Sequence, residues 1–206
     1  MVKRQQRSIL TEERLNSAVI EVLKGEGLVG CTVPVVAERA GVAVGTIYRR
    51  YRNKEALVAA AILDFVSLGG GERDSDYADL AASAADLRDF LRRVSEIAVQ
   101  AARDNRTFLL AIRNFTNTTR DETWRRQFEA QRGRGRESIV RAAMARFGPE
   151  ISGGEQQLRL SLAALYGAVE VIWLEPQAGL FAEPPSLVEF IQAFVEMQAM
   201  FLSSGT

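Results

Sequence analysis

The residues best suited to chemistry are two adjacent arginines, Arg49 and Arg50, on a short helix predicted near the amino end. Ile47 and Tyr51 share one side of this helix at spacing i, i+4 and are expected to face the core, which lets the arginines point outward. Arginines that reach base edges in a groove of DNA read its sequence. Lys54 follows at the start of the next helix, where free N–H groups already attract phosphate. These residue types and spacings predict contacts with DNA.

Two short helices and a glycine turn must position these arginines. The first helix is predicted over 33–40, with Thr32 as its N-cap and Gly41 at its end. Its buried stripe follows the spacing i, i+3, i+4, i+7 through Val33, Val36, Ala37 and Ala40. The second helix is predicted over about 44–51, and Gly45 in it lets the backbone approach DNA closely. This layout is that of a helix-turn-helix, whose second helix enters the major groove.

The run from Thr32 to Leu57, TVPVVAERAGVAVGTIYRRYRNKEAL, resembles the amino-terminal signature of the tetracycline-repressor (TetR) family of bacterial regulators. The resemblance covers about residues 10–60. It implies phosphate contacts from Thr32, Thr46, Tyr48 and Lys54. It also implies groove-facing positions at Val44, Gly45, Arg49 and Arg50. Ala43 stands where the family often has serine, Arg50 and Tyr51 replace a frequent aromatic pair, and Arg52 stands where proline is common. These departures leave the operator sequence open.

Composition narrows the class of protein. The chain has 206 residues, 47% of them hydrophobic, with no histidine and a single cysteine, Cys31. Without histidine, a nucleophile motif or a glycine-rich phosphate loop, we expect no enzyme, and we expect no metal and no cofactor. Cys31 is interpreted as a small core residue, with a thiol sensor as the alternative. The absence of a secretory signal and of a long uninterrupted apolar stretch favours a cytoplasmic protein without a membrane segment.

Charge is distributed unevenly along a chain whose net charge is zero. Residues 1–58 contain ten Lys and Arg against six Asp and Glu, whereas residues 155–206 contain one against six. The cationic end is the one that carries the helix-turn-helix, as displacement of counterions from DNA requires. Lys3, Arg4 and Arg7 form either an arm that adds contacts to DNA or a solvated tail.

The remaining pattern predicts an all-α fold of about nine helices. The other helices are expected at about 11–25, 54–67, 84–103, 106–117, 121–147, 155–174 and 186–203. A polar, glycine-rich linker is predicted after helix 54–67. We therefore expect a DNA-binding domain at 1–58, joined through helix 54–67 to an effector-binding and dimerisation domain at 68–206.

The last two predicted helices carry more apolar surface than one small domain can cover. The helix at 155–174 is apolar almost all round after Arg159, and the helix at 186–203 is apolar along two sides. Pairing with symmetric copies in a four-helix bundle would cover them, and the resemblance implies the same mode of dimerisation. Two recognition helices one DNA turn apart then read a palindrome.

Family members usually hold an effector in the carboxy-terminal domain, and this sequence offers candidates for such a pocket. They combine aromatic side chains with a few polar ones: Arg113, Asn114, Phe115, Trp124, Phe128, Tyr166, Glu170 and Trp173. The alternative interpretation is that the aromatic side chains are core residues and that Glu170 pairs with an arginine at the dimer interface.

These features predict a ligand-responsive transcriptional regulator. We expect a repressor that binds a palindromic operator in double-stranded DNA as a homodimer and is released by a small-molecule effector. Activation is left open because it depends on where the operator lies. The alternative is an interaction or co-regulator protein that has kept the fold and lost operator binding.

Overall fold

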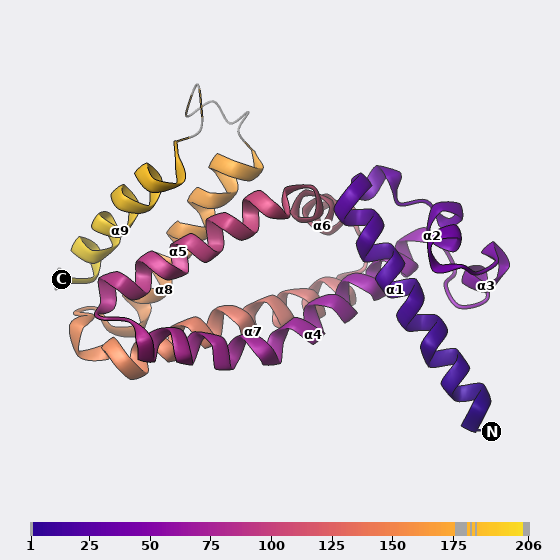
Figure 1. Ribbon diagram of the computed structural model, residues 1–206, viewed down its shortest axis with the longest axis horizontal. Coiled ribbons are helices and arrows are strands. Elements are labelled where there is room, and N and C mark those ends of the chain that lie inside the picture. Colours follow the sequence, from indigo (N-terminus) through magenta and orange to yellow (C-terminus); the bar gives the residue numbers. More distant parts are fainter. Residues whose placement is uncertain (1, 176–180, 182, 184, 204–206) are drawn as a thin grey trace. The chain divides into compact units, whose positions relative to one another are not determined.

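The computed structural model describes residues 2–175, 181, 183 and 185–203, and gives the backbone alone at 2–5, 7 and 68–75. All regular elements of this described part are helical, which confirms the all-α prediction (Figure 1). In chain order the α-helices are α1 (Val2–Gly30), α2 (Val33–Ala40), α3 (Val44–Tyr48), α4 (Lys54–Ser83), α5 (Leu87–Asp104), α6 (Arg106–Thr118), α7 (Glu122–Phe147), α8 (Gly154–Val169) and α9 (Leu187–Ser203).

The helices form two compact units. Unit 1 contains Met1–Gly70 and Thr107–Arg132, and unit 2 contains Gly71–Arg106 and Gly133–Thr206. Residues 107–132 thus pack with the helix-turn-helix, although they lie in the range assigned from sequence to the effector domain. That functional division of the chain at residues 58 and 68 stays a prediction.

Unit 1 has one hydrophobic core, to which α1, α2, α3, α4, α6 and α7 all contribute. Its fully covered side chains include Leu15, Val19, Leu23, Val36, Ile47, Leu57, Val58, Ile62 and Phe128. The expected stripe of α2 is buried as predicted. The Thr32 hydroxyl accepts the Val35 N–H, and Gly41 ends α2 in the left-handed conformation, with φ 63° and ψ 43°.

Several predicted helix limits are wrong. α1 is helical from Val2 to Gly30, with a break at Gly27 (φ 68°), whereas 11–25 was expected. The backbone of Lys3, Arg4 and Arg7 is therefore helical, while the side chains of these three residues lie outside the described part. α4 continues to Ser83 through the glycine-rich stretch that was predicted as a linker. Glycine lowers helix stability by only about 1 kcal/mol per residue, so flanking helical turns can carry it.

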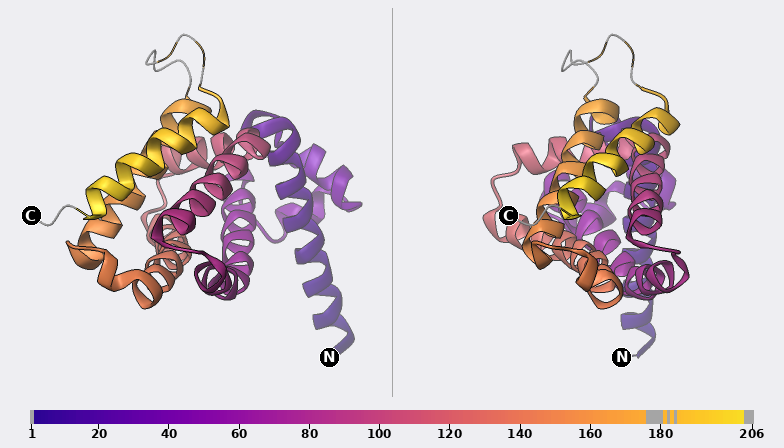
Figure 2. Two further views of the ribbon diagram at one scale, coloured as in Figure 1. Left: turned by 60° about the vertical axis from the view of Figure 1, so that its left-hand side comes forward. Right: turned by 90° about the vertical axis from the view of Figure 1, so that its left-hand side faces the viewer.

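Unit 2 is built around α5, α8 and α9, which pack against one another (Figures 1 and 2). α8 ends at Val169 and is followed by a π-helical turn, η2 (Glu170–Leu174), so the single α-helix predicted over 155–174 is wrong in its last turn. The Arg106 Nε–H donates to the Trp173 carbonyl at 3.0 Å, and Nη2 donates to the Leu174 carbonyl at 3.3 Å. These bonds satisfy carbonyl groups at the end of the turn.

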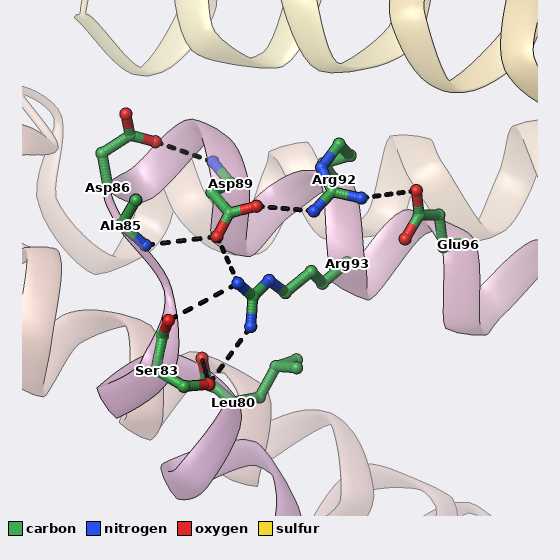
Figure 3. A network of polar contacts seen from close by, with 8 residues as sticks. All are labelled: Leu80, Ser83, Ala85, Asp86, Asp89, Arg92, Arg93 and Glu96. Atoms are coloured by element: carbon green, nitrogen blue, oxygen red, sulfur yellow. Dashed lines mark hydrogen bonds and ion pairs between the residues drawn. The ribbon is translucent and has the colours of Figure 1, made fainter.

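A polar network fixes the start of α5 (Figure 3). Asp86, the N-cap of α5, accepts the Asp89 N–H at 2.8 Å, and Asp89 accepts the N–H of Ala85, the residue before the cap, at 3.2 Å. Asp89 also pairs with Arg92 at 2.6 Å and with Arg93 at 2.7 Å. These hydrogen bonds, led by the one from Arg92, lower the pKa of Asp89 to about 2.

Gly154–Leu174 is one described segment that is long and apolar enough to cross a membrane, by length and composition alone. This differs from the expectation that charges interrupt every apolar stretch too early. Its residues take part in the packing of unit 2, where Leu158, Leu162 and Leu165 are buried. The predicted proline- and glycine-containing loop before α9 lies mostly outside the described residues.

Candidate nucleic-acid interface

The short helix α3, which the sequence predicts to contact DNA, is held by a single buried side chain and presents most of its surface outward. Ile47 is 1% exposed and fills the core of unit 1, whereas Val44 and Tyr48 are exposed. A side chain at Gly45 would meet nothing within 4 Å, so the backbone is open to close approach. Ala43 provides no side-chain cap, as expected where family members often have serine. The N–H groups at the start of α3 are therefore left for other acceptors.

The two arginines lie at the carboxyl end of α3 rather than within it. The predicted helix to Tyr51 is too long, because the Arg50 N–H bonds back to Ile47 O across three residues and tightens the chain into a turn. Both side chains are exposed. Arg49 Nη2 donates to the Thr46 hydroxyl at 3.3 Å. Thr46 and Arg49 thus form one polar group on the outer surface of the helix.

Arg50 is held against α1. Its Nη2 donates to the Ser8 hydroxyl at 3.0 Å and to the Ser8 carbonyl at 3.1 Å. No local pattern in the sequence indicates this contact, because the two residues are 42 positions apart. Arg14, on the same helix, donates to the carbonyls of Ala40 and Gly41 at the end of α2. α1 therefore positions both helices of the helix-turn-helix through side chains that the sequence analysis did not single out.

The other predicted phosphate ligands lie at helix ends. Thr32 is exposed at the start of α2, where its hydroxyl serves as the N-cap. Lys54 opens α4 as predicted, and its Nζ donates to the Leu28 carbonyl at 2.9 Å. Asn53 caps the same helix by accepting the Ala56 N–H at 2.9 Å. The Lys54 ammonium therefore lies at the start of α4 and is hydrogen-bonded to α1.

Cys31 is buried between α1 and α2. Burial raises the pKa of its thiol above the ordinary value, with Lys54 acting to lower it and Glu26 to raise it. The neutral, covered thiol fits a core residue rather than a reactive sensor. Among the residues that the structure describes, no cluster of three or more His, Cys, Asp or Glu is placed to hold a metal ion.

Residues 17–61, which contain the second half of α1, all of α2 and α3 and the start of α4, match the family of bacterial regulatory proteins described as the tetR family. Over this amino-terminal segment, about a fifth of its length, the chain is similar to the tetR family. The match covers the helix-turn-helix and the exposed polar face of α3 described above. No curated protein sequence matches the chain at a significant level.

Solved structures of TetR-like proteins share the fold of nearly the whole chain. The fatty acid degradation regulator FadR from Bacillus halodurans has 15% identity and a TM-score of 0.62, over 92% of this chain and 94% of that one. FadR from Bacillus subtilis, solved in complex with stearoyl-CoA, has 16% identity and a TM-score of 0.59, over 91% and 97%. A TetR transcriptional regulator from Rhodococcus sp. RHA1 has 20% identity and a TM-score of 0.57, over 98% and 100%.

The effector residues predicted by analogy with the TetR family fall into two groups, one in each unit. Phe115, Trp124 and Phe128 are buried in the core of unit 1. The Trp124 ring stacks on Phe128 at 5.0 Å and meets the edge of Phe115 at 4.9 Å, while its Nε1–H donates to the Ala59 carbonyl at 2.8 Å. Arg113 is partly buried and Asn114 exposed on α6. The three rings have the contacts of core residues, the alternative that the sequence left open.

The second group lies on α8 and η2 in unit 2. Tyr166 has the Arg136 guanidinium over its ring at 5.0 Å, and Trp173 meets the edge of Phe190 at 4.8 Å. Glu170 is partly buried and starts the π-helical turn. π-helical turns are frequent at functional sites of α-helical proteins. An effector role for either group stays a prediction.

Proposed function

We propose that this chain is a ligand-responsive transcriptional repressor of the TetR family that binds a palindromic operator as a homodimer. The observation that carries the proposal is the outer face of α3. There Tyr48, 56% exposed, and the polar pair Thr46 and Arg49 surround an uncovered Gly45 backbone. A helix of this kind can enter the major groove, with arginine at base edges and hydroxyl groups at phosphates.

Dimerisation is supported by a continuous apolar surface on α8 and α9, which pack side by side in unit 2. On α8 the exposed residues repeat at i, i+3, i+4 and i+7, and on α9 they include two methionines. We call this set the α8–α9 face: Leu160, Ala163, Ala164, Gly167, Ala193, Met197 and Met200. Small residues let the helices of a second copy approach closely, and a twofold pair places two reading helices on one palindrome.

The proposed response to a ligand is supported by a structural relative. FadR from Bacillus subtilis was solved with stearoyl-CoA bound. For this chain we propose regulation by the same kind of event, the binding of a small molecule. A small molecule that binds the released dimer more tightly than the operator-bound dimer shifts the population off the operator.

The test is fluorescence anisotropy with a labelled duplex from the region upstream of the gene, titrated with the wild type and with Arg49→Ala. Loss of a base contact should weaken specific binding by about 1–3 kcal/mol, or roughly fivefold to 150-fold. The matched control is Arg103→Ala, because Arg103 is an exposed helical arginine in unit 2. It should leave the affinity unchanged.

A salt titration of the same complex separates specific from general binding. Neutralised phosphates give a linear fall of log affinity with log salt concentration. Equal affinity of wild type and Arg49→Ala for the duplex would refute the recognition role of α3, and equal losses in both arginine variants would indicate general electrostatic binding.

A further inference from the structure

Unit 2 contains a groove of about 750 Å³ between α5 and α9. None of the residues predicted from sequence as effector ligands lines it. Its volume lies within the range of pockets that bind small organic molecules, about 300–1,000 Å³. The lining consists of an apolar floor and a charged rim. The floor residues are Ile97, Leu187, Val188, Ile191 and Val195, and the charged rim residues are Asp86, Arg88, Asp89, Arg92, Glu96 and Glu196.

The floor exposes apolar surface that packing within unit 2 leaves uncovered. Val188 is 72% exposed and Ile97 is 44% exposed, although Ile191 and Val195 beside them are buried. Covering such surface is favourable by about 25 cal/mol per Å². An alkyl chain laid along the two helices would therefore be stabilised here.

The rim favours a cation over an anion. Four carboxylates and two guanidinium groups line the groove, and Arg93 pairs with Asp89 at 2.7 Å from outside the lining, which leaves a formal excess of one negative charge. Both guanidinium groups are already engaged: Arg88 pairs with Glu196, and Arg92 pairs with Asp89 at 2.6 Å and with Glu96 at 2.7 Å (Figure 3 shows the Arg92 contacts). An anionic head group would compete with these carboxylates for the arginines, whereas a cationic head group can join the carboxylates without competing for an existing pair.

We propose that the α5–α9 groove binds a cationic amphiphile, with its alkyl chain on the floor and its ammonium group among the rim carboxylates, of which Glu96 and Glu196 are about half exposed. The binding site depends on unit 2 alone. Its role as the effector site, by contrast, rests on the proposed function.

The groove lies on a different side of α9 from the α8–α9 face. At 100° per residue, Val188 and Gln192 point roughly opposite to Met197, which belongs to that face. A second copy seated on the α8–α9 face would therefore leave this side of α9 open, and the dimer can hold a ligand in each protomer.

The test is isothermal titration calorimetry of the full chain with decyltrimethylammonium and with decanoate, both below their micellar concentrations. The two probes have similar chains and opposite charges. We expect the cation to bind at least about fivefold more tightly, equivalent to roughly 1 kcal/mol from exposed ion pairs. Equal or tighter binding of decanoate, or no binding of either probe, would overturn the proposal.

Two variants localise the binding. Ile97→Ser/Val188→Ser should weaken both probes, because it removes exposed methyl groups from the floor, while Val29→Ser, at an exposed valine of unit 1, should change neither. Glu96→Gln/Glu196→Gln should abolish or reverse the preference for the cation, because Arg88 and Arg92 then lose carboxylate partners. An unchanged preference would refute the rim assignment. The titration contains no DNA, so a failure of operator binding leaves its outcome unaffected.

Discussion

The two neighbouring arginines of the interface differ in what holds them. Arg49, which directly follows α3, contacts Thr46 of that helix, so its guanidinium stays on the outer surface of α3. Arg50 is tied to Ser8 of α1 by two hydrogen bonds from one nitrogen, and its other donors remain for DNA. A side chain already held in place loses less conformational freedom on binding. Ser8 is therefore a positioning residue for the predicted contact of Arg50 with DNA.

We predict that Ser8→Ala weakens operator binding by about 0.5–1.5 kcal/mol, the usual worth of one hydrogen bond. The loss should disappear when Ser8→Ala is added to Arg50→Ala, and it should persist when Ser8→Ala is added to Arg49→Ala. Anisotropy titrations of the six proteins, wild type included, form two double-mutant cycles. An equal loss in both backgrounds would show that Ser8 does not act through Arg50.

The pKa of Asp89 is lowered from 3.8 to about 2, mainly by the hydrogen bond from Arg92. Because the folded-state pKa lies below the unfolded one, the stabilisation is present above pH 3.8 and is lost as the pH falls towards 2. Denaturant unfolding should show the wild type more stable than Asp89→Asn near neutral pH, with a difference that shrinks through this window. Asp79→Asn, at an exposed aspartate of α4, is the control. A pH-independent difference would argue against the ionised pairs.

The surroundings of a residue could be predicted from the sequence where local spacing determines them. They could not be predicted where contacts between residues distant in the sequence determine them. The buried Ile47, the cap at Thr32 and the turn at Gly41 follow from patterns within one or two turns of helix. No such local pattern distinguishes the surroundings of Trp124, because the spacing of Trp124 and its aromatic neighbours fits a ligand pocket as well as a core. Its burial, its ring contacts with Phe115 and Phe128 and its hydrogen bond to Ala59, 65 residues away, place it in the core of unit 1.

At the scale of elements, alanine substitutions at Gly41 and Gly133 should change the free energy of unfolding in opposite directions. Gly41 ends α2 with φ 63°, and a Cβ there would stand 2.8 Å from Arg14 Nη2, so Gly41→Ala should lower the free energy of unfolding by about 1–2 kcal/mol. Gly133 lies inside α7 with nothing within 4 Å of an added Cβ, so Gly133→Ala should raise it by about 0.5–1 kcal/mol. Urea unfolding of both variants tests this pair, and a stabilising Gly41→Ala would contradict it.

Glycine-rich stretches help to explain which helix limits could be predicted from the sequence. The order of the helices follows from apolar periodicity, and most interior limits agree within a few residues. The largest errors, in α1 and α4, lie at glycine-rich or polar stretches such as Gly69–Gly71, where local propensity points to a break. Whether a helix continues there depends on the packing of the turns on either side, which a single sequence does not reveal.

At the scale of the whole molecule, the α8–α9 face is the feature that a single chain leaves unexplained. Leu160 is 54% exposed and Met200 is 70% exposed, on neighbouring helices of unit 2. We expect a second copy of the chain to cover this surface, and a helix covered in that way has as much reason to be apolar as a helix in lipid, which would account for the composition of Gly154–Leu174. The proposed dimerisation would thus link the composition of the carboxy-terminal helices to the proposed reading of DNA.

We predict that Leu160→Glu/Met200→Glu produces a monomer, because the dimer would bury two unpaired carboxylates per protomer. Sedimentation velocity at micromolar concentration should show the wild type as a dimer and the variant as a monomer, while Val29→Glu, at an exposed valine of unit 1, should remain a dimer. The monomer should bind a half-site duplex as the wild-type protomer does and lose the added affinity for the full palindrome. A dimeric variant would refute the α8–α9 face, and a monomer with undiminished affinity for the palindrome would refute paired reading.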